Sequence, residues 1–428
     1  TAHHCKYTIA VVASVRCVYE TAHTPIREFL LGTFFSKTFK NAWVLSLSNA
    51  VAGSTLPLMH LAGTLAGSRL APSPDWSTAP IALMILGTAC SVIPVSRTMQ
   101  HFGRKTGIYL FLAVGIMVCI LAMTALHIAS FTLFCIASFI LGSFNATLLQ
   151  SRFAAMESVG IEDRTTAASM FMGSGIIAAF VGPEIALIGK DLFVTAYQGS
   201  FLMAALCIVI SAAMLTFYKP ESMPVAPEVK PKIAANQLFL NPTFCLALAS
   251  GAVAYIVMSF IMTGTPLSMH EVHGHSLVDT KWVIQSHIAA MFLPSFFAPV
   301  LARYAGLRVM MLLGLISYCI AIAVGYSDNS TQSFWMQLVL LGVGWNFLFT
   351  AGTTLLPSTH QEEDRFKAQS INDLTVFSFQ AIAALSAGWA LQLIGWQQMA
   401  LLCLIPVSIM LLALVWERIK TDKAQTNI

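Results

Sequence analysis

Three ionisable residues interrupt long apolar runs of this sequence and could bind and release protons. They are Glu184, His287 and Asp373. A charge inside an apolar segment is costly, which marks such residues as functional candidates, and histidine changes charge near neutral pH. We expect proton exchange at all three. The structural alternatives are a lipid-headgroup contact or an ion pair with Lys190 for Glu184, a polar helix end or arginine partner for Asp373, and a packing hydrogen bond for His287.

A basic side chain at the end of another apolar run could bind an anionic group. Asn145, Leu149 and Arg152 share one face of an expected helix by their spacing. This face could line a cavity that opens to one side of a membrane. The alternative is that Arg152 is a structural anchor that pairs with Glu157 or with another acidic residue at the inner surface.

The elements that carry these residues are duplicated. Asn145 aligns with Asn346 when one charged triplet is placed on another in the second half of the chain. The triplets are Glu162, Asp163 and Arg164, and Glu363, Asp364 and Arg365. Weak internal symmetry between apolar halves is typical of secondary transporters. We expect the triplets to form ion pairs between helices that close the cytosolic side as a gate.

The composition is that of a membrane protein. Hydrophobic residues make up 57% of the 428 residues and charged residues 10%, with a mean hydropathy of +0.75. Twelve apolar runs have about the length that a helix needs to cross a bilayer. They are residues 43–64, 77–96, 107–127, 130–152, 167–188, 193–217, 242–267, 281–302, 308–326, 333–355, 369–393 and 397–416.

A charged, proline-rich segment separates two sets of six spans. We therefore predict a cytosolic N-terminal tail, a six-helix bundle, a cytosolic linker, a second six-helix bundle and a cytosolic C-terminal tail. Their bounds are 1–40, 41–218, 219–240, 241–418 and 419–428. With both termini in the cytosol, all but Arg69, Lys190 and Lys281 of the 23 lysines and arginines fall on the cytosolic side, as the positive-inside rule requires.

Several other classes of function lack support in the sequence. The net charge of +4 is spread between apolar runs, so nucleic-acid binding is not expected. The nine cysteines are scattered, and we read them as packing residues. We predict no metal site, no cofactor and no enzymatic activity, since neither a Walker A motif nor a catalytic triad is recognised.

One turn resembles a known family signature. Gly103, Arg104 and Lys105 match the end of the loop motif between spans two and three of the major facilitator superfamily. Ser96, Gln100 and His101 stand where that motif has Gly, Asp and Arg. The missing Asp puts the latch that it normally forms between the halves in doubt. The resemblance covers residues 41 to 418 and is closest in style to a poorly characterised bacterial branch.

The resemblance implies an all-α membrane protein with two pseudo-symmetric six-helix bundles around a central cavity. In this family, spans one, four, seven and ten line that cavity. Asn49 and Tyr255 then join Asn145, Arg152 and Asn346 as candidate cavity residues. Trp345 could stack on a flat ligand there, although plain packing is the alternative.

From these observations we expect a monomeric secondary transporter in a bacterial inner membrane, moving a small organic solute by alternating access. Proton coupling is expected from the buried acids and histidine. The Gly182–Pro183 element in span five favours efflux. The alternatives are uptake of a nutrient such as a vitamin or iron-chelate, favoured because Ser138 replaces the arginine of proton-coupled exporters, a facilitated uniporter, and a non-transporting receptor.

Overall fold

The computed structural model describes residues 37–160, 163–220, 235–361 and 364–426. Within these ranges the chain is helical and contains no strand. The predicted linker lies mostly outside them, although a short helix, α10 (Ala235–Leu238), precedes the second half. The predicted N-terminal tail contributes only its last few residues.

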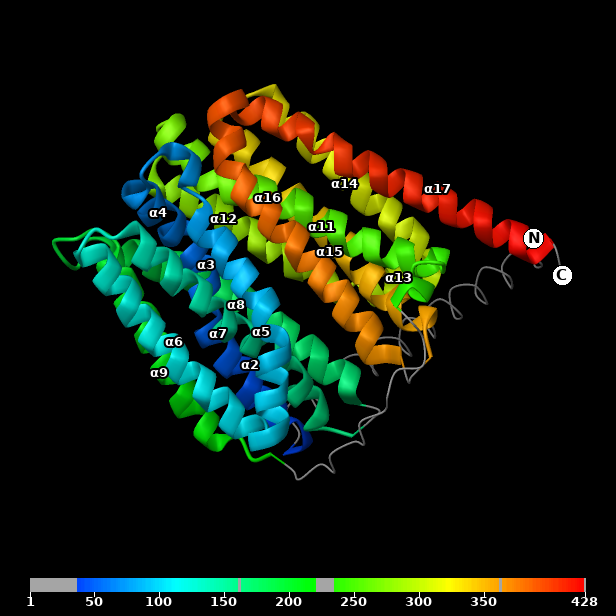
Figure 1. Ribbon diagram of the computed structural model, residues 1–428, viewed down its shortest axis with the longest axis horizontal. Coiled ribbons are helices and arrows are strands. Elements are labelled where there is room, and N and C mark those ends of the chain that lie inside the picture. The colour runs from blue at the N-terminus through cyan, green and yellow to red at the C-terminus, as the bar shows by residue number, and fades with distance from the viewer. Residues whose placement is uncertain (1–36, 161–162, 221–234, 362–363, 427–428) are drawn as a thin grey trace, which may run out of the picture.

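The helices form two groups that follow one another in the sequence (Figure 1). The first half contains α2 (Lys40–Gly53), α3 (Thr55–Leu58), the π-helical turn η3 (Met59–Gly63), α4 (Thr64–Leu70), α5 (Ala79–Phe102), α6 (Arg104–His127), α7 (Phe131–Glu157), α8 (Arg164–Lys190) and α9 (Gln198–Met214). The second contains α11 (Pro242–Pro266), η7 (Leu267–Val272), α12 (Leu277–Phe292), η8 (Leu293–Phe296), α13 (Ala298–Ala305), α14 (Leu307–Ser327), α15 (Thr331–Leu355), α16 (Arg365–Leu402) and α17 (Leu404–Thr426).

Each predicted span has a helical counterpart. In the described ranges, nine helices are long and apolar enough to cross a membrane. One of these, Lys367–Asp422, contains two spans, because Gly395 takes a φ of 74° and breaks the helix. The first and eighth spans are interrupted helices: η3 lies within the first, and η8 with Pro294 divides the eighth. The last helix continues to Thr426, beyond the predicted end of the bundle at residue 418.

Local sequence signals explain where the helices begin and turn. The side chains of Ser130, Asn241 and Ser330 accept hydrogen bonds from backbone N–H groups in the first turn of α7, α11 and α15. Gly103 and Gly306 have φ values of 83° and 85°, which only glycine adopts easily. They make the same turn at the same place in each half, as the duplicated sequence predicts.

Small residues bring helices within each half into close contact. Gly87 of α5 lies against the backbone of Phe139 in α7, and Gly142 of α7 lies against the backbone of Thr88 in α5. A Cβ at either glycine would overlap those backbone atoms. Close backbone approach through small residues is how membrane helices commonly associate.

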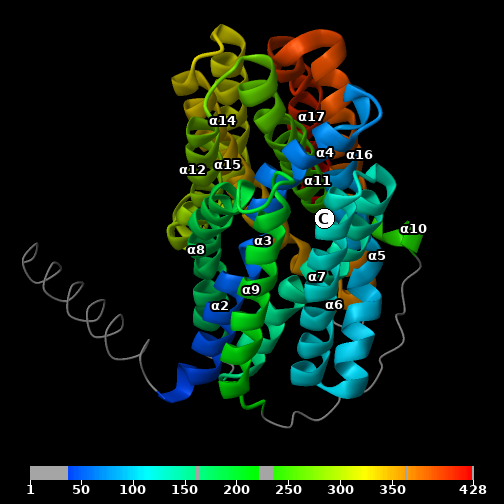
Figure 2. The same cartoon turned by 90° about the vertical axis from the view of Figure 1, so that its left-hand side faces the viewer.

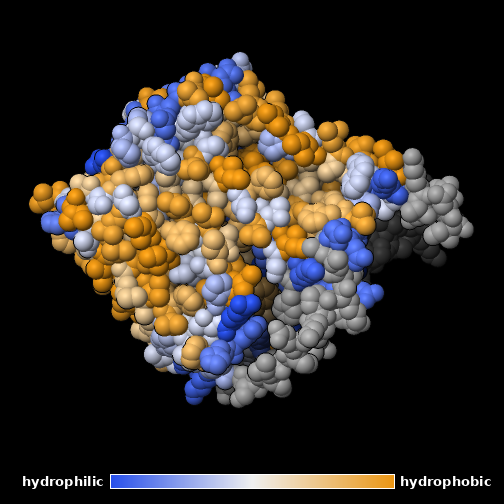
Figure 3. All heavy atoms as spheres, in the orientation of Figure 1, coloured by the Kyte–Doolittle hydropathy of each residue, from blue (hydrophilic) through white to orange (hydrophobic). Residues whose placement is uncertain are grey.

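The outer surface is apolar where lipid would contact it. Figure 3 shows hydrophobic residues across the middle of the molecule and hydrophilic residues gathered toward its ends. Large exposed hydrophobic side chains include Met117 and Ile120 on α6, Ile210 on α9 and Leu412 on α17. This arrangement, together with the helix lengths, is that of a multi-pass integral membrane protein.

Candidate functional site

The two halves meet through α5 with α16 and through α8 with α12. Figure 2 shows the helices of the second half gathered above those of the first, with α8 beside α12 and α5 beside α16. We use the term basic end for the end of the molecule at which α5 is followed by α6. The basic side chains there include Arg97, Arg104, Lys105, Arg303 and Arg308.

Polar contacts join the halves toward the end opposite the basic end. Thr78 Oγ1 donates to the Leu385 carbonyl at 3.1 Å and accepts from the Gly388 N–H at 3.3 Å. Gln285 Nε2 donates to the Phe180 carbonyl at 2.9 Å. From the closed opposite end, α5 and α16 separate toward the basic end (Figure 1). We refer to the region between the halves on the basic side of these polar contacts as the cleft.

An aromatic cluster lies on the second-half side of this cleft. Tyr255 of α11 makes edge contacts with Trp345 and Phe349 of α15, each with ring centroids 5.3 Å apart, and with Phe377 of α16 at 6.0 Å. Trp345 and Phe349 are stacked at 4.9 Å. Trp345 is only 3% exposed, whereas Tyr255, Phe349 and Phe377 are half-buried. The sequence analysis identified Tyr255 and Trp345 as candidates, but not Phe349 or Phe377.

Two opposite charges from different halves lie beside this cluster. Arg152 of α7 and Asp373 of α16 are close enough to act electrostatically on each other and on Tyr255. No ion pair joins them in this conformation of the described chain. The Arg152 guanidinium lies over the Phe153 ring at 5.1 Å, and Asp373 Oδ1 accepts from Asn372 Nδ2 at 3.1 Å. Glu157, the predicted anchor partner of Arg152, pairs with Arg104 instead.

The duplicated asparagines bond within their own halves. Asn145 Nδ2 donates to Thr88 Oγ1 at 3.1 Å, and Asn346 Nδ2 donates to the Met291 carbonyl at 2.7 Å and to Ser295 Oγ. Asn346 is 1% exposed. These amides therefore tie neighbouring helices of each half together in this conformation. Contact with a solute stays a prediction for both.

Of the remaining candidates, Asn49 bonds within the first half, Glu184 bonds across to the second half, and His287 bonds within the second half. Asn49 Nδ2 donates to Ser174 Oγ at 3.0 Å, from α2 to α8. Glu184 pairs with Lys281 of the second half rather than with its neighbour Lys190, at 2.7 Å. His287 is fully buried, and its Nδ1 donates to the Leu338 carbonyl at 2.7 Å. The packing hydrogen bond expected for His287 is thus present, and its proton exchange stays a prediction.

The signature turn anchors the basic end of the first half. Arg104 donates from Nε and Nη2 to both oxygens of Glu157, at 3.0 and 2.6 Å. Lys105 Nζ donates to the carbonyls of Thr216 and Tyr218. These contacts lie between α6, α7 and the end of α9, so this turn holds three helices of one half together.

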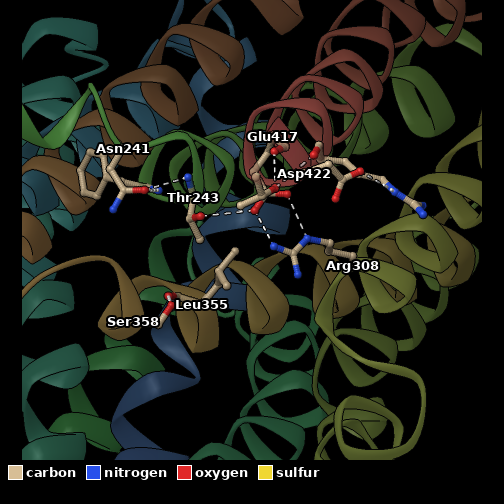
Figure 4. Close-up of polar contacts among 10 residues, drawn as sticks. Asn241, Thr243, Arg308, Leu355, Ser358, Glu417 and Asp422 are labelled. Atoms are coloured by element: carbon tan, nitrogen blue, oxygen red, sulfur yellow. Dashed lines mark hydrogen bonds and ion pairs between the residues drawn. The ribbon is translucent and has the colours of Figure 1, made fainter. Parts of the chain in front are cut away.

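In the second half, a buried carboxylate that the sequence analysis missed likewise holds three helices together. Glu417 of α17 is 0% exposed and accepts two hydrogen bonds from Arg308 and one from Thr243 Oγ1 at 3.3 Å (Figure 4). The signal in the sequence was an acidic residue directly after the predicted end of the last apolar span, at residue 416. The N-cap Asn241 lies next to this site (Figure 4).

The structure describes only part of the predicted cytosolic gate. Glu162 and Glu363 lie outside the described residues. Asp163 and Asp364 directly precede α8 and α16, which begin with Arg164 and Arg365. Asp163–Arg164 and Asp364–Arg365 thus occupy matching sequence positions at the start of α8 and α16. Their closure as a gate stays a prediction.

Comparison with known proteins gives one family. The model of the Major Facilitator Superfamily matches residues 39–304 and 247–428. The chain is 30% identical to the riboflavin transporter RfnT of Brucella anthropi, over 88% of this chain and 95% of that one. It is also 30% identical to two uncharacterized MFS-type transporters of Bacillus subtilis, YdeG over 89% and 92% of the two chains and YddS over 82% and 84%.

Solved structures agree on the fold. A bacterial homologue of the human lysosomal transporter Spinster, in an inward-facing and occupied conformation, superposes with a TM-score of 0.69. The match covers 90% of this chain and 97% of that one at 11% identity. The unoccupied, inward-facing form of that homologue gives a TM-score of 0.67 at 13% identity.

Proposed function

The chain belongs to the major facilitator superfamily, and from this premise we propose that it carries a flat heteroaromatic solute of the flavin class across the membrane. The solute binds in the cleft between the halves. Rocking of the two halves then exposes it to one side of the membrane and the other in turn.

The aromatic cluster carries this proposal. A planar ring system can bury apolar area against the half-buried Tyr255 and Phe349, which pack on Trp345, and ring stacking adds binding energy of about 0.5–1.5 kcal/mol per aromatic pair beyond the area buried. A small number of polar groups beside an apolar wall fixes the orientation of a ligand. Arg152 and Asp373 are suited to this part, because one donates to and the other accepts from the polar edge of a heterocycle.

The resemblance to a riboflavin transporter supports the same solute class. It favours the vitamin alternative over a general drug exporter, in keeping with Ser138 at the position of the exporters' arginine. The direction of transport, and efflux as suggested by Gly182–Pro183, stays a prediction. We further propose that the basic end faces the cytosol, as the distribution of lysine and arginine supports, and that Asp373 couples transport to protons.

Binding is tested directly by titrating the purified protein into riboflavin and following flavin fluorescence, which stacking on an indole quenches. We expect saturable quenching. Trp345→Leu should weaken binding by roughly 10–100-fold, since stacking of a base on an aromatic side chain contributes about 1–3 kcal/mol, and Trp345→Phe should weaken it less. Trp389, which is 55% exposed on α16, provides the control variant Trp389→Leu.

Unchanged affinity in Trp345→Leu, or no quenching by riboflavin in the wild type, would remove the basis of the proposal. Direction is then measured in a bacterial strain that cannot make riboflavin. Growth on low external riboflavin shows uptake, whereas loss of preloaded riboflavin to the medium shows efflux.

A further inference from the structure

Two histidines from different halves lie together where the halves make contact. His60 stands in the π-helical turn η3 of the first span, and His287 lies in α12 of the eighth. The helices α3, α8 and α12 all contact one another, and η3 contacts α8. The imidazoles are close enough for the charge of one to act on the other. Of the two, only His287 was recognised from the sequence.

Each ring has a buried nitrogen without a hydrogen-bond partner. These atoms are Nδ1 of His60 and Nε2 of His287. The bond from His287 Nδ1 to the Leu338 carbonyl requires the hydrogen on Nδ1. In the neutral ring Nε2 is therefore an unprotonated acceptor that faces no donor of the described chain. Buried polar atoms left unpaired are uncommon and ask for an explanation.

The backbone near His60 is also unusual. A π-helical turn within an α-helix is rare and frequently occurs at functional sites. This one follows directly on α3, against which Gly182 of α8 packs so closely that a Cβ would meet the backbone of Ser54. The turn thus lies next to a close contact between α3 and α8 within the first half.

The charged and titratable groups around the pair have other partners or lie nearer the loops. Glu184 of α8 pairs with Lys281 of α12, and Arg69 of α4 lies over the Tyr197 ring. His270, His273 and His275, in and after η7, bond to backbone or hydroxyl groups of the second half. Asp75 accepts from Ser73, and Glu271 is exposed. The helices α11 and α15 present no charged residue to the pair within the described chain.

We propose that His60 and His287 form a proton-binding site shared by the two halves, which is neutral while the opposite end is closed and takes up protons when that end opens. In the closed form a protonated ring would be a buried charge without a carboxylate partner, and two protonated rings would repel each other. Once the halves separate, water can hydrate both imidazolium ions. The open form therefore binds more protons, and lower pH shifts the population toward it.

This site differs in location and consequence from Asp373, which lies beside Arg152 in the cleft. It would respond to the pH on the side of the membrane opposite the basic end. Because opening is a property of the protein alone, the inference stands or falls without any knowledge of the transported solute.

The test measures the separation of the halves at the opposite end as a function of pH. Val194 and Val272 are exposed there, one in each half. Spin labels at Val194→Cys and Val272→Cys, in a background in which the nine native cysteines are replaced and transport is retained, give the distance distribution by pulsed electron resonance. From pH 8 to pH 5 we expect the longer-distance population to grow.

The steepness of the response reports the number of protons. One linked proton changes the ratio of open to closed forms by at most about tenfold per pH unit, and two by about a hundredfold. His60→Gln leaves the His287 bond to Leu338 in place, and it should reduce a slope above one proton to one or below. The double variant His60→Gln/His287→Gln should show no response in this range.

His127 is exposed at the end of α6 and lies away from the contact between the halves, so His127→Gln should respond like the wild type. A wild type whose distances do not change with pH, or a His60→Gln variant with the full wild-type slope, would overturn the proposal.

Discussion

Lys281 of the second half donates a hydrogen bond of 2.7 Å from Nζ to Oε2 of Glu184 in the first half. Lys281 lies near the start of α12 and Glu184 near the end of α8, on the side of the molecule opposite the basic end. Because they belong to different halves, they are in contact only while this end is closed. We therefore expect the pair to contribute to the balance between closed and open forms of this end.

Neutralising this pair should favour opening at the opposite end. Glu184 is half exposed, and exposed pairs contribute roughly 0.2–1 kcal/mol. Glu184→Gln should change the ratio of open to closed forms by up to about fivefold, measured with the labels at residues 194 and 272. The charge-exchanged variant Glu184→Lys/Lys281→Glu should return the ratio toward that of the wild type. A ratio unchanged in all three proteins would show that the pair has no influence.

Asp373 should be required for the response of transport to a pH gradient. Asp373→Asn cannot exchange a proton, so we expect gradient-driven accumulation in proteoliposomes to be lost while solute exchange between the two sides continues. Glu271→Gln changes an exposed acid and serves as the control. Accumulation at the wild-type level in Asp373→Asn would assign coupling to another group.

The ion pair of Arg308 and Glu417 should be asymmetric in its effect on stability. Arg308→Ala leaves the carboxylate of Glu417 buried, with Thr243 as its one hydrogen-bond donor among the described side chains, and we expect a loss of about 3 kcal/mol. Glu417→Gln leaves a half-exposed guanidinium that water can reach, and it should cost nearer 1 kcal/mol. Unfolding in detergent by denaturant measures both. Equal losses would mean that Glu417 is not desolvated as described.

The crossing of α5 and α7 should not tolerate a methyl group. Gly87→Ala places a Cβ against the backbone of Phe139, which cannot move aside as a flexible side chain would. We expect a destabilisation of about 1–3 kcal/mol or more, seen as a lower melting temperature. Gly160→Ala is the matched control, because its Cβ would meet nothing within 4 Å.

High pH should destabilise the basic end through Tyr218. Burial, followed by the negative charge of Glu157, raises the pKa of Tyr218 to about 12, against about 10 in an unfolded chain. This phenol therefore adds stability that is complete below about pH 10 and is lost as the pH rises to about 12. The maximum is on the order of 2–3 kcal/mol. Tyr218→Phe should lose less stability than the wild type between pH 9 and 11.5, whereas the exposed Tyr326→Phe should behave like the wild type.

The fold was readable from the sequence because a bilayer imposes a minimum length on apolar helices and because the two halves repeat each other. Gly103 shows this well, since its turn was recognised from the sequence and takes a positive φ, and Gly306 makes the same turn in the second half. The helix interruptions were harder. Nothing in Met59–Gly63 signals a π-helical turn, which depends on how neighbouring helices press on the chain.

The sequence indicated which individual residues belong to the site, but it did not indicate which residues contact one another. Composition located Glu184, Asp373 and Trp345 as unusual, but partners are set by which helices adjoin. Lys281 is distant in sequence from Glu184, and Glu157 was assigned to Arg152 because it is near in sequence, whereas the turn at Gly103 carries Arg104 to it. Phe349 and Phe377 were passed over because phenylalanine is common in such helices.

The two ion pairs at the basic end, Arg104–Glu157 and Arg308–Glu417, also differ in when they can form during synthesis. Arg104 and Glu157 are separated by 53 residues and belong to consecutive spans, so their bond can close while most of the chain is still unmade. Arg308 must wait for Glu417, which is made 109 residues later. The first ion pair can therefore form once α7 has been made, whereas the second cannot form until α15, α16 and part of α17 have been made as well.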